Sequence, residues 1–437
     1  MRFTSNIQSP GFFIPLTVLF LTAACSKDND GGKEADPYDP GKPITISHFS
    51  PDSGGKATQL VITGENFGND TAFVRLNVGG KKAVVVGVKN NKIYALVPRK
   101  LSGDVDLQLK VHDRDVSAQK RFRYIITQSV STISGKVGPD GKGVTADGPL
   151  AEAQFSFPQY ITADDEGNLM VLQYDGTDFR GLRQVSISQN KVTRIPAGSP
   201  YGITIRKSDN QVLAIQRDNQ YPVILTGLAP LNSWQPKAFY ATTAGSPVFG
   251  AGDYPLAGAY DNTTGRLYVY NWLAGRLNYV NPVTKEEKVV TQFNFNGFGR
   301  VAVDNNGVIY ASSRARHCIF KVDPATGATT IFAGTDGGAG FLNGPGANAK
   351  FNAPEDMVFD SQNNMYVADS RNNCIRKVTP TGLVTTYAGM PEEAAGYEDG
   401  LPLKSKFNFP NGVAVDKNDV LYVTDMNNHR IRAVTVE

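Results

Sequence analysis

The sequence predicts an all-β protein in which a small two-sheet sandwich precedes a six-bladed β-propeller. Two observations lead to this prediction. One sequence phrase, a repeat, occurs twice near the C-terminus, beginning at Phe351 and again at Phe407, and weaker copies of its parts recur upstream. Such repetition is the signature of repeat architectures. Before these repeats, short runs of alternating apolar and polar residues are broken by glycine and asparagine, as in small antiparallel sheets.

The composition agrees with a strand-rich protein of two or three domains. The 437 residues include 44 Gly, 25 Pro, 23 Phe and 18 Tyr, a profile typical of secreted β proteins. The formal net charge is only +3, from 44 basic and 41 acidic residues. Because this charge is small and evenly spread, it gives no indication of nucleic acid as a partner.

Residues 1–25 have the three parts of an export signal. Arg2 supplies a positive start, and the apolar run Gly11–Ala24 is short for a membrane span. Small residues then precede Cys25. The segment resembles a bacterial lipoprotein signal peptide, which implies that Cys25 becomes the lipidated first residue, although Thr22 stands where the family prefers Leu. A transmembrane anchor or an ordinary cleaved signal is the alternative.

Residues 26–42 are expected to form a flexible linker. They are rich in Gly, Pro and Asp and have no apolar periodicity, so they cannot bury enough surface to fold. The stretch Ser26–Asp30 resembles the acidic post-cysteine signal of Bacteroidetes lipoproteins. That resemblance implies an outer-membrane, lipid-anchored protein that faces the exterior.

Residues 43–126 predict an immunoglobulin-like sandwich of about seven short strands. Gly79-Gly80 is expected at a hairpin turn with positive φ. The segment resembles the IPT/TIG family, whose pattern matches Phe49, Pro51, Gly54, Ile62, Gly64, Asn66, Phe67, Gly68, Val97 and Pro98. These residue types serve corners and packing, so the domain is interpreted as a spacer with no catalytic set.

Two recurring phrases divide the chain over residues 128–437. The first predicts the outermost strand of a blade, and its copies span 129–135, 192–198, 239–245, 285–293, 328–334 and 383–389. The second is an apolar hairpin, also present six times, that turns through Gly, Asn and Asp. Six pairs of phrases predict six blades.

The order of the phrases predicts how the ring closes. Segment 129–135 precedes every hairpin, and the last hairpin reaches Glu437 without an outer strand. We therefore expect 129–135 to pair with the last blade, which removes an exposed sheet edge. The phrases resemble the NHL repeat family, most clearly in the last three blades. Seven blades or an open array are the alternatives.

Other recurring features are interpreted as structural. The loops 147–155, 341–351 and 397–407 share a phrase that ends in Phe, and we expect each Phe to pack the loop onto its blade. Aspartates follow the strands at Asp304, Asp360, Asp369, Asp416 and Asp425, and are predicted to cap turns. Cys318 and Cys374 are expected to be small packing residues.

Candidate ligand-binding residues follow from the loops that gather at one face of a propeller. The first three blades depart from the repeat toward aromatic residues, which suit stacking against a sugar ring. The candidates are Trp272, Tyr174, Phe179, Tyr160, Tyr201, Arg300, Arg314 and Arg371. The alternative is that the rings pack under their own loops.

No constellation in the sequence indicates catalysis. His317 and His429 occupy equivalent repeat positions, but Asn373 takes that place between them, so no metal or other cofactor is expected. Glu355 and Asp356 are adjacent carboxylates facing the expected channel. Neighbouring residues of a strand point to opposite faces, so they are a poor acid–base pair.

The combination of anchor, linker, IPT/TIG spacer and NHL-like propeller resembles surface lipoproteins encoded with polysaccharide-uptake systems in Bacteroidetes. The resemblance implies a non-catalytic protein that binds polysaccharide or oligosaccharide for an outer-membrane transporter. One alternative is a polysaccharide hydrolase or lyase built on a propeller. Another is a scaffold that binds protein partners of a surface complex.

Overall fold

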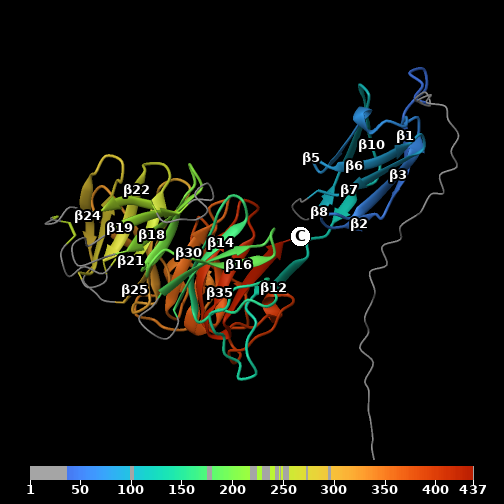
Figure 1. The fold of residues 1–437 in the computed structure, drawn as a ribbon. Helices are drawn as coiled ribbons and strands as arrows, with labels where there is room; N and C mark the ends of the chain where they lie inside the picture. Colours follow the sequence, from blue (N-terminus) through green and yellow to red (C-terminus); the bar gives the residue numbers. More distant parts are fainter. Residues whose placement is uncertain are drawn as a thin grey trace, which may run out of the picture. The chain divides into compact units, whose positions relative to one another are not determined.

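The computed structural model describes residues 37–98, 103–174, 180–216, 224–228, 237–241, 246, 248–249, 255–271, 274–293 and 297–436. The chain divides into two compact units, Met1–Arg123 and Tyr124–Glu437, and strands make up nearly all of its regular structure (Figure 1). Within the described ranges, no helix has the length and apolar character needed to cross a membrane. Cys25 lies outside the described residues.

The described residues of the first unit form three sheets of short strands, and the strands of the first two pair antiparallel. The first contains β1 (Thr45–Ser50), β3 (Gln59–Glu65), β7 (Lys92–Leu96) and β6 (Val84–Lys89). The second contains β10 (Arg114–Ser117), β9 (Leu107–Val111), β4 (Val74–Val78) and β5 (Lys81–Lys82). The third contains β2 (Ser53–Gly54), β11 (Phe122–Tyr124) and β8 (Gly103–Val105). The strands outnumber the seven expected because several are only two or three residues long.

Residues expected at the corners of the sandwich serve packing. Phe67 is 1% exposed, and its ring packs against Gly64, where an added Cβ would lie 2.5 Å from Cζ of Phe67. A Cβ atom on Gly64 would lie 1.8 Å from the carbonyl oxygen of Thr45, so only glycine permits this close approach of β3 to β1. Gly79 and Gly80 have φ of 54° and 77° and join β4 to β5, which confirms the predicted hairpin.

The described residues of the second unit form six antiparallel sheets that follow one another along the chain. The first sheet contains β13 (Pro158–Ala163), β14 (Asn168–Tyr174), β15 (Arg180–Ser186) and β16 (Lys191–Ile195). The second contains β17 (Gly202–Arg206), β18 (Gln211–Gln216), β19 (Ile224–Leu228) and β20 (Lys237–Ala241). The third contains β21 (Pro255–Asp261), β22 (Arg266–Asn271), β23 (Arg276–Val280) and β24 (Glu287–Gln292).

The remaining sheets complete the series. The fourth contains β25 (Phe298–Val303), β26 (Ile309–Ser313), β27 (Cys318–Val322) and β28 (Thr329–Ala333). The fifth contains β30 (Pro354–Phe359), β31 (Met365–Asp369), β32 (Cys374–Val378) and β33 (Leu383–Ala388), with the short β29 (Gly344–Pro345). The sixth contains β34 (Pro410–Val415), β35 (Leu421–Asp425), β36 (Arg430–Val436) and β12 (Gln128–Ser134). Single 3-10 turns occur at Thr71–Phe73, Gly346–Asn348, Ser370–Asn372, Pro402–Lys404 and Met426–Asn428.

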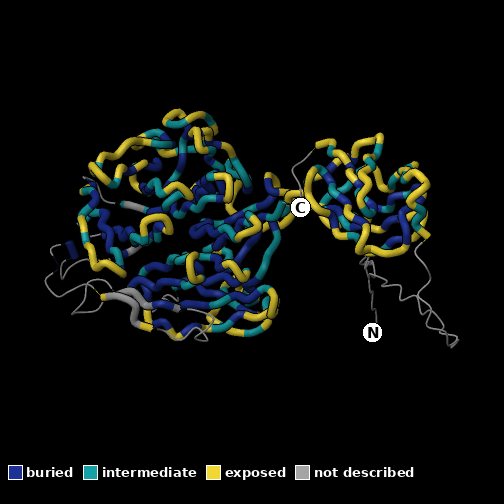
Figure 2. The backbone as a smooth tube through the Cα atoms, turned by 90° about the horizontal axis from the view of Figure 1, so that it is seen from above, coloured by how far each residue is buried: buried dark blue, intermediate teal, exposed yellow. Residues whose placement is uncertain are grey.

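The sheets close into a ring. Strand β12 pairs antiparallel with β36, with Val130 opposite Val434, so the first strand of the unit completes the last sheet as predicted. The first strand of each sheet contacts that of the next, in the order β13, β17, β21, β25, β30, β34 and back to β13. Residues of all six inner strands line a common cavity at the centre of this ring. Buried residues concentrate along the strands (Figure 2). The predicted class, an all-β sandwich followed by a propeller, is confirmed.

The three long loops are anchored by arginine, and their predicted structural role is confirmed. Phe155, Phe351 and Phe407 are each at most 1% exposed. In the fifth sheet Arg376, which is fully buried, donates to the carbonyls of Leu342 and Lys350, each at 2.9 Å. Its guanidinium also lies 5.1 Å from the centre of the Phe351 ring. Arg183 and Arg432 hold the loops at 147–155 and 397–407 in the same way.

Only part of the prediction for the aspartates is correct. The carboxylates of Asp304, Asp360 and Asp416 accept backbone N–H groups of the turns that follow them, as expected. Asp369 and Asp425 are instead fully buried ion-pair partners. Their Oδ2 atoms lie 2.8 Å from Nη1 of an arginine on the next strand, Arg376 and Arg432 respectively.

The equivalent residues His317, Asn373 and His429 join neighbouring sheets. The Nδ1 atom of His317 accepts the backbone N–H of Ala353, and Oδ1 of Asn373 accepts that of Phe409. His429 accepts the N–H of Phe157 at 3.3 Å, across the point of ring closure. In the described part of the chain, no three His, Cys, Asp or Glu side chains gather as a metal ion would require. Cys318 and Cys374 are buried and not disulfide-bonded, which confirms their packing role.

Candidate functional site in the propeller channel

Several inner strands begin with a β-bulge that aims side chains into the channel. The pairing register shifts between Phe298 and Val301 in β25, and at the same place in β30 and β34. Ser312 fixes one bulge, because its Oγ accepts the N–H of Arg300 at 2.7 Å and donates to the carbonyl of Glu355. A hydroxyl from the second strand therefore connects two sheets at the level of Arg300. Bulges commonly redirect side chains near functional sites.

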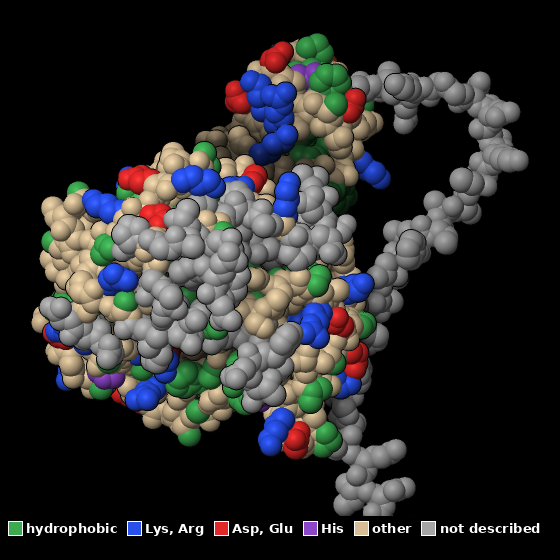
Figure 3. Space-filling model, turned by 60° about the vertical axis from the view of Figure 1, so that its left-hand side comes forward, with side chains coloured by type: hydrophobic (Ala, Val, Ile, Leu, Met, Phe, Trp, Pro, Cys, Tyr) green, Lys and Arg blue, Asp and Glu red, His purple; other side chains and the backbone are tan. Residues whose placement is uncertain are grey.

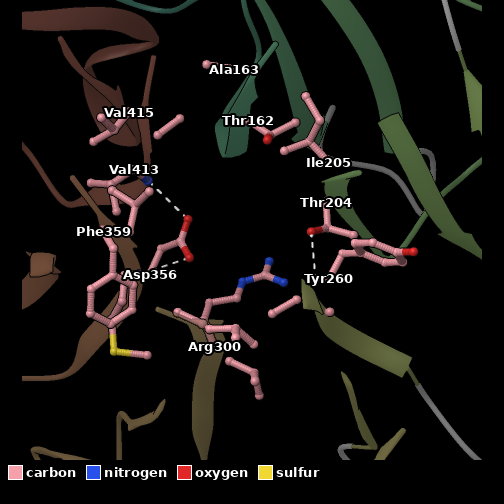
Figure 4. Close-up of a pocket in the computed structure, with 18 of the residues that line it drawn as sticks. Thr162, Ala163, Thr204, Ile205, Tyr260, Arg300, Asp356, Phe359, Val413 and Val415 are labelled. Carbon is pink, nitrogen blue, oxygen red and sulfur yellow. Dashed lines mark hydrogen bonds between the residues drawn. The ribbon is translucent and has the colours of Figure 1, made fainter. Parts of the chain in front are cut away.

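A cavity of about 260 Å3 occupies the channel and touches the inner strands of all six sheets. Its apolar walls come from residues such as Ile203, Val301 and Val413, and its neutral polar groups include Thr162 and Thr204. Its charged or aromatic lining residues are Tyr160, Tyr260, Phe359, Lys207, Arg300, Asp304 and Asp356. Figure 4 shows the Arg300 guanidinium directed into the space between Asp356 and Thr204.

Arg300 places a buried positive charge in this cavity. The residue is 6% exposed, and its guanidinium carbon lies 3.0 Å from the centre of the Tyr160 ring. Burial lowers the pKa of Arg300 to about 10, while the charges of Asp356 and Glu355 act to raise it. The side chain therefore remains a cation at neutral pH, and its contact with the Tyr160 ring is a cation–π interaction.

Asp356 lies beside this cation. Burial raises the pKa of its carboxyl to about 6, although Arg300 and two backbone N–H groups act to lower it. Its Oδ1 accepts the N–H of Met357 and its Oδ2 accepts that of Val413, each at 3.0 Å. Asp356 is therefore mostly anionic at neutral pH, and both of its oxygens are held by the backbone.

Glu355 faces away from the cavity, as strand alternation predicts. Its Oε1 lies 2.6 Å from Nε of Arg314, which comes from the preceding sheet. Burial raises the pKa of Glu355 to about 7, and the charges of Arg314 and Arg300 act to lower it. Since Glu355 does not line the cavity, only one of the two adjacent carboxylates can reach a ligand there.

Two of the eight predicted ligand-binding residues, Tyr160 and Arg300, line the cavity. Arg314 and Arg371 do not line it, but their charges act on Glu355, which faces away from it. Tyr174 at the end of β14 and Tyr201 before β17 are half-buried and do not line the cavity. The other two candidates, Trp272 and Phe179, lie outside the described residues.

The sequence reasoning missed Asp356, Thr204 and Lys207. The sequence places Asp356 at the expected channel, but beside Glu355 it suggests only half of a poor acid–base pair rather than a ligand-binding residue. A positional signal was nevertheless present, because Asp356 occupies the same place in its inner strand as Arg300 does in β25. Aligning the strands by that place would have selected both residues.

Charged groups are dispersed on the face of the molecule drawn in Figure 3. In Figure 3 the described basic and acidic side chains on the visible face are interspersed, and neither sign gathers into a large patch. This distribution agrees with the small net charge of +3. The buried cation in the channel is therefore a local feature rather than part of a basic surface.

Two parts of the chain match known domain families. The chain contains an IPT/TIG domain at residues 43–124 and an NHL repeat at residues 407–433, which confirms both resemblances. It is 26% identical over 377 residues to NHL repeat-containing protein 2 of Homo sapiens. That alignment covers 78% of this chain and 47% of the human protein, so the chain spans about half the length of this relative.

Solved structures share the fold over most of the chain. A structural genomics protein of unknown function from Bacteroides thetaiotaomicron has a TM-score of 0.71 and 26% identity, with 92% of this chain and 100% of that chain covered. An auxiliary nutrient binding protein from Bacteroides ovatus has a TM-score of 0.63 and 22% identity, with the same coverage. The second likeness establishes the fold alone.

Proposed function

We propose that the protein is a cell-surface lipoprotein that binds the end of a polysaccharide, or a short oligosaccharide, in the propeller channel. It does not cleave this ligand but presents it to an outer-membrane uptake system. The observation that carries the proposal is the channel cavity, in which the cation of Arg300 and the carboxylate of Asp356 lie beside aromatic and hydroxyl side chains. A small number of convergent polar groups in an otherwise apolar pocket is typical of sites that bind small ligands.

The geometry favours recognition by hydrogen bonds over stacking on Tyr160. One face of that ring is covered by the guanidinium of Arg300, so the ring orients the arginine rather than offering that face to a sugar. A cavity of about 260 Å3 is also small beside typical ligand pockets of about 300–1,000 Å3. It therefore suits a chain end better than the middle of a polymer.

The arrangement of the carboxylates argues against glycoside hydrolysis. A glycosidase needs two carboxyl groups on either side of the bond to be cleaved. Here Asp356 faces the cavity while Glu355 is turned toward Arg314. The other acid of the lining, Asp304, caps the turn that follows β25 through the N–H groups of Asn306 and Val308.

Cellular location completes the proposal. The N-terminal sequence supports lipidation at Cys25 and an outer-membrane anchor, with residues 26–42 and the IPT/TIG domain as spacers. The fold shared with a Bacteroides protein named for nutrient binding is consistent with this role. Trp272 and Phe179 remain candidates for additional contacts with the glycan.

The test combines binding and cleavage on the same samples. The full-length protein in detergent is titrated calorimetrically with a panel of oligosaccharides, and each mixture is then assayed for new reducing ends and unsaturated products. Saturable binding without products supports the proposal, and release of products would show an enzyme instead. Failure to bind every glycan, combined with co-purification of an outer-membrane complex, would favour a scaffold.

A further inference from the structure

We propose that the ligand is acidic, and that the carboxylate of a uronic acid residue binds the guanidinium of Arg300 inside the channel. This inference rests on the proposed function and adds to it the chemical class of the sugar. It follows from the position of the Arg300 cation in the cavity, from its contact with the Tyr160 ring and from where the other charges of the lining lie.

The acidic side chains of the lining are held by backbone donors. Asp356 accepts N–H groups with both oxygens, one from Met357 and one from Val413. At the other end of β25, Oδ1 of Asp304 accepts the N–H groups of Asn306 and Val308. Each carboxylate therefore serves a strand or a turn, and neither is arranged mainly to receive sugar hydroxyls.

Several neutral polar groups of the lining are committed as well. Oγ1 of Thr204 accepts the N–H of Tyr260 at 3.2 Å, which ties β17 to β21. Oδ1 of Asn262 accepts the N–H of Lys207 at 2.8 Å. The hydroxyl of Thr263 donates to Asp261 at 2.6 Å. These contacts connect strands and turns, so the fold fixes the positions of these neutral groups.

The cations stand at two levels of the cavity. Arg300 lies at the level of Tyr160, near the beginning of the inner strands, and Lys207 follows the end of β17. A ligand lying along the channel would meet both. Arg300 is 6% exposed whereas Lys207 is exposed, so a negative charge is attracted most strongly at Arg300, where the effective dielectric constant is far below that of water.

The orientation of Arg300 suits a carboxylate. The ring of Tyr160 covers a face of the guanidinium, whereas bidentate recognition of a carboxylate uses an edge of that planar group. Stacking therefore fixes the plane of the cation without competing for the geometry that a carboxylate requires. A hydroxyl of a neutral sugar would gain neither the second hydrogen bond nor the charge.

The experiment compares matched acidic and neutral sugars on the intact protein. Glucuronic, galacturonic and mannuronic acid oligosaccharides are titrated against their neutral parents of equal length and linkage. We expect at least one acidic member to bind about tenfold or more tightly than its neutral parent. We also expect this preference to weaken as salt is increased.

Substitutions of Arg300 test whether this residue causes the preference for acidic over neutral sugars. Arg300→Gln should abolish the preference for the acidic sugar, and Arg300→Lys should retain part of it, because the charge remains without the planar edge. Arg75→Gln, at an exposed position of β4 in the sandwich, is the matched control and should bind as the native protein does. Melting temperatures establish that each variant is folded.

The possible outcomes separate this inference from the proposed function. Equal affinity for acidic and neutral sugars would overturn the acidic class and leave glycan binding intact, whether or not the Arg300 variants fold. Tighter binding of sulfated than of uronic sugars would overturn the assignment to a carboxylate. Absence of binding to every sugar would overturn the proposed function itself.

Discussion

The Nδ1 atom of His317 accepts a hydrogen bond from the backbone N–H of Ala353 at 3.0 Å, and this contact joins the fourth sheet of the propeller to the fifth. His429 makes the equivalent contact where the sixth sheet meets the first, through the N–H of Phe157. An acceptor at Nδ1 requires that nitrogen to be unprotonated. Two junctions of the ring therefore depend on neutral histidine.

We expect the histidine contacts to weaken in acid. Burial lowers the pKa of both His317 and His429 below the usual value, and nearby arginines, Arg371 and Arg430 respectively, lower it further. An unfolded histidine titrates near 6.5, so below about pH 6.5 the unfolded chain binds more protons than the folded one. The histidine contribution to stability is thus present at higher pH and is lost as pH falls.

The variant His317→Asn/His429→Asn tests this expectation, because Asn373 fills the same role in the fifth sheet. Free energies of unfolding are measured by urea denaturation between pH 5 and 8. The buried acids Asp356 and Glu355 have raised pKa values of about 6 and about 7. Their contribution to stability therefore grows as pH falls, opposite to that of the histidines, and it is the same in the native chain and in the variant. The variant should lose less stability in acid than the native chain, and identical pH profiles would contradict the prediction.

The buried pair of Arg376 and Asp369 is expected to be critical for the fifth sheet. Both side chains are fully buried with their charged atoms 2.8 Å apart, and Arg376 also holds the loop at 341–351. Arg376→Ala should cost roughly 3–5 kcal/mol, because it leaves an uncompensated buried charge. The double variant Arg376→Met/Asp369→Leu should cost less than the single one. A single variant that loses under about 1 kcal/mol in urea denaturation would refute this account.

Much of the fold could be predicted because its signals are local. The repeated phrases fix six outer and six hairpin segments, and the position of 129–135 before every hairpin is enough to predict its pairing with β36. The roles of Asp369 and Asp425 could not be predicted in this way. In the sequence, Asp369 and Asp425 cannot be told from turn-capping aspartates. Only the pairing register of the next strand brings Arg376 and Arg432 beside them.

The site was harder to predict than the fold. Whether an inner-strand residue faces the channel depends on a bulge, and a shift of one residue moves a side chain to the other face. Tyr160 is a candidate because the first blades depart from the repeat toward aromatic residues, and Arg300 because it lies at the entry to an inner strand. Asp356 lies at an equivalent entry position, but the sequence presents it as the neighbour of Glu355. Contacts such as that between Arg300 and the Tyr160 ring join strands far apart in sequence, and no spacing rule reveals them.

Gly64 and Gly87 offer a matched pair in the first sheet of the sandwich. A Cβ atom on Gly64 would lie 1.8 Å from the carbonyl oxygen of Thr45, whereas on Gly87 its nearest neighbour would be a ring carbon of Tyr94 at 3.7 Å. Gly64→Ala should therefore destabilise the sandwich by about 2 kcal/mol or more, and Gly87→Ala should be nearly neutral. Thermal unfolding followed by circular dichroism measures both, and equal effects would show that β3 can move away from β1.

The thiols of Cys318 and Cys374 are expected to be unreactive in the folded protein. Both are buried and free of disulfide bonds, and burial raises the pKa of Cys318 to about 11 and that of Cys374 well above its usual value. Because the thiolate is the reactive form, labelling with iodoacetamide at pH 8 should be slow until denaturant is added. Peptide mass spectrometry locates the label, and rapid native labelling of either residue would contradict its packing role.

Binding of an acidic sugar should strengthen as pH falls through the titration of Asp356. Burial raises the pKa of Asp356 to about 6, and its negative charge lies beside Arg300, where it competes with the carboxylate of the ligand. Protonation below about pH 6 removes that competition, whereas a sugar carboxylate, an ordinary carboxylic acid, stays ionised well below that pH.

The variant Asp356→Asn removes the charge at every pH. It should bind uronic oligosaccharides more tightly than the native protein at pH 7 and should lose the rise in affinity between pH 7 and 5. Glu355, with a pKa raised to about 7, faces Arg314 and is the other acid that acts on Arg300, so Glu355→Gln serves as the comparison. If only the Glu355 variant flattens the calorimetric profile, the controlling charge lies outside the cavity. If affinity falls in acid for both the native protein and Asp356→Asn, then Asp356 does not compete with the ligand for Arg300.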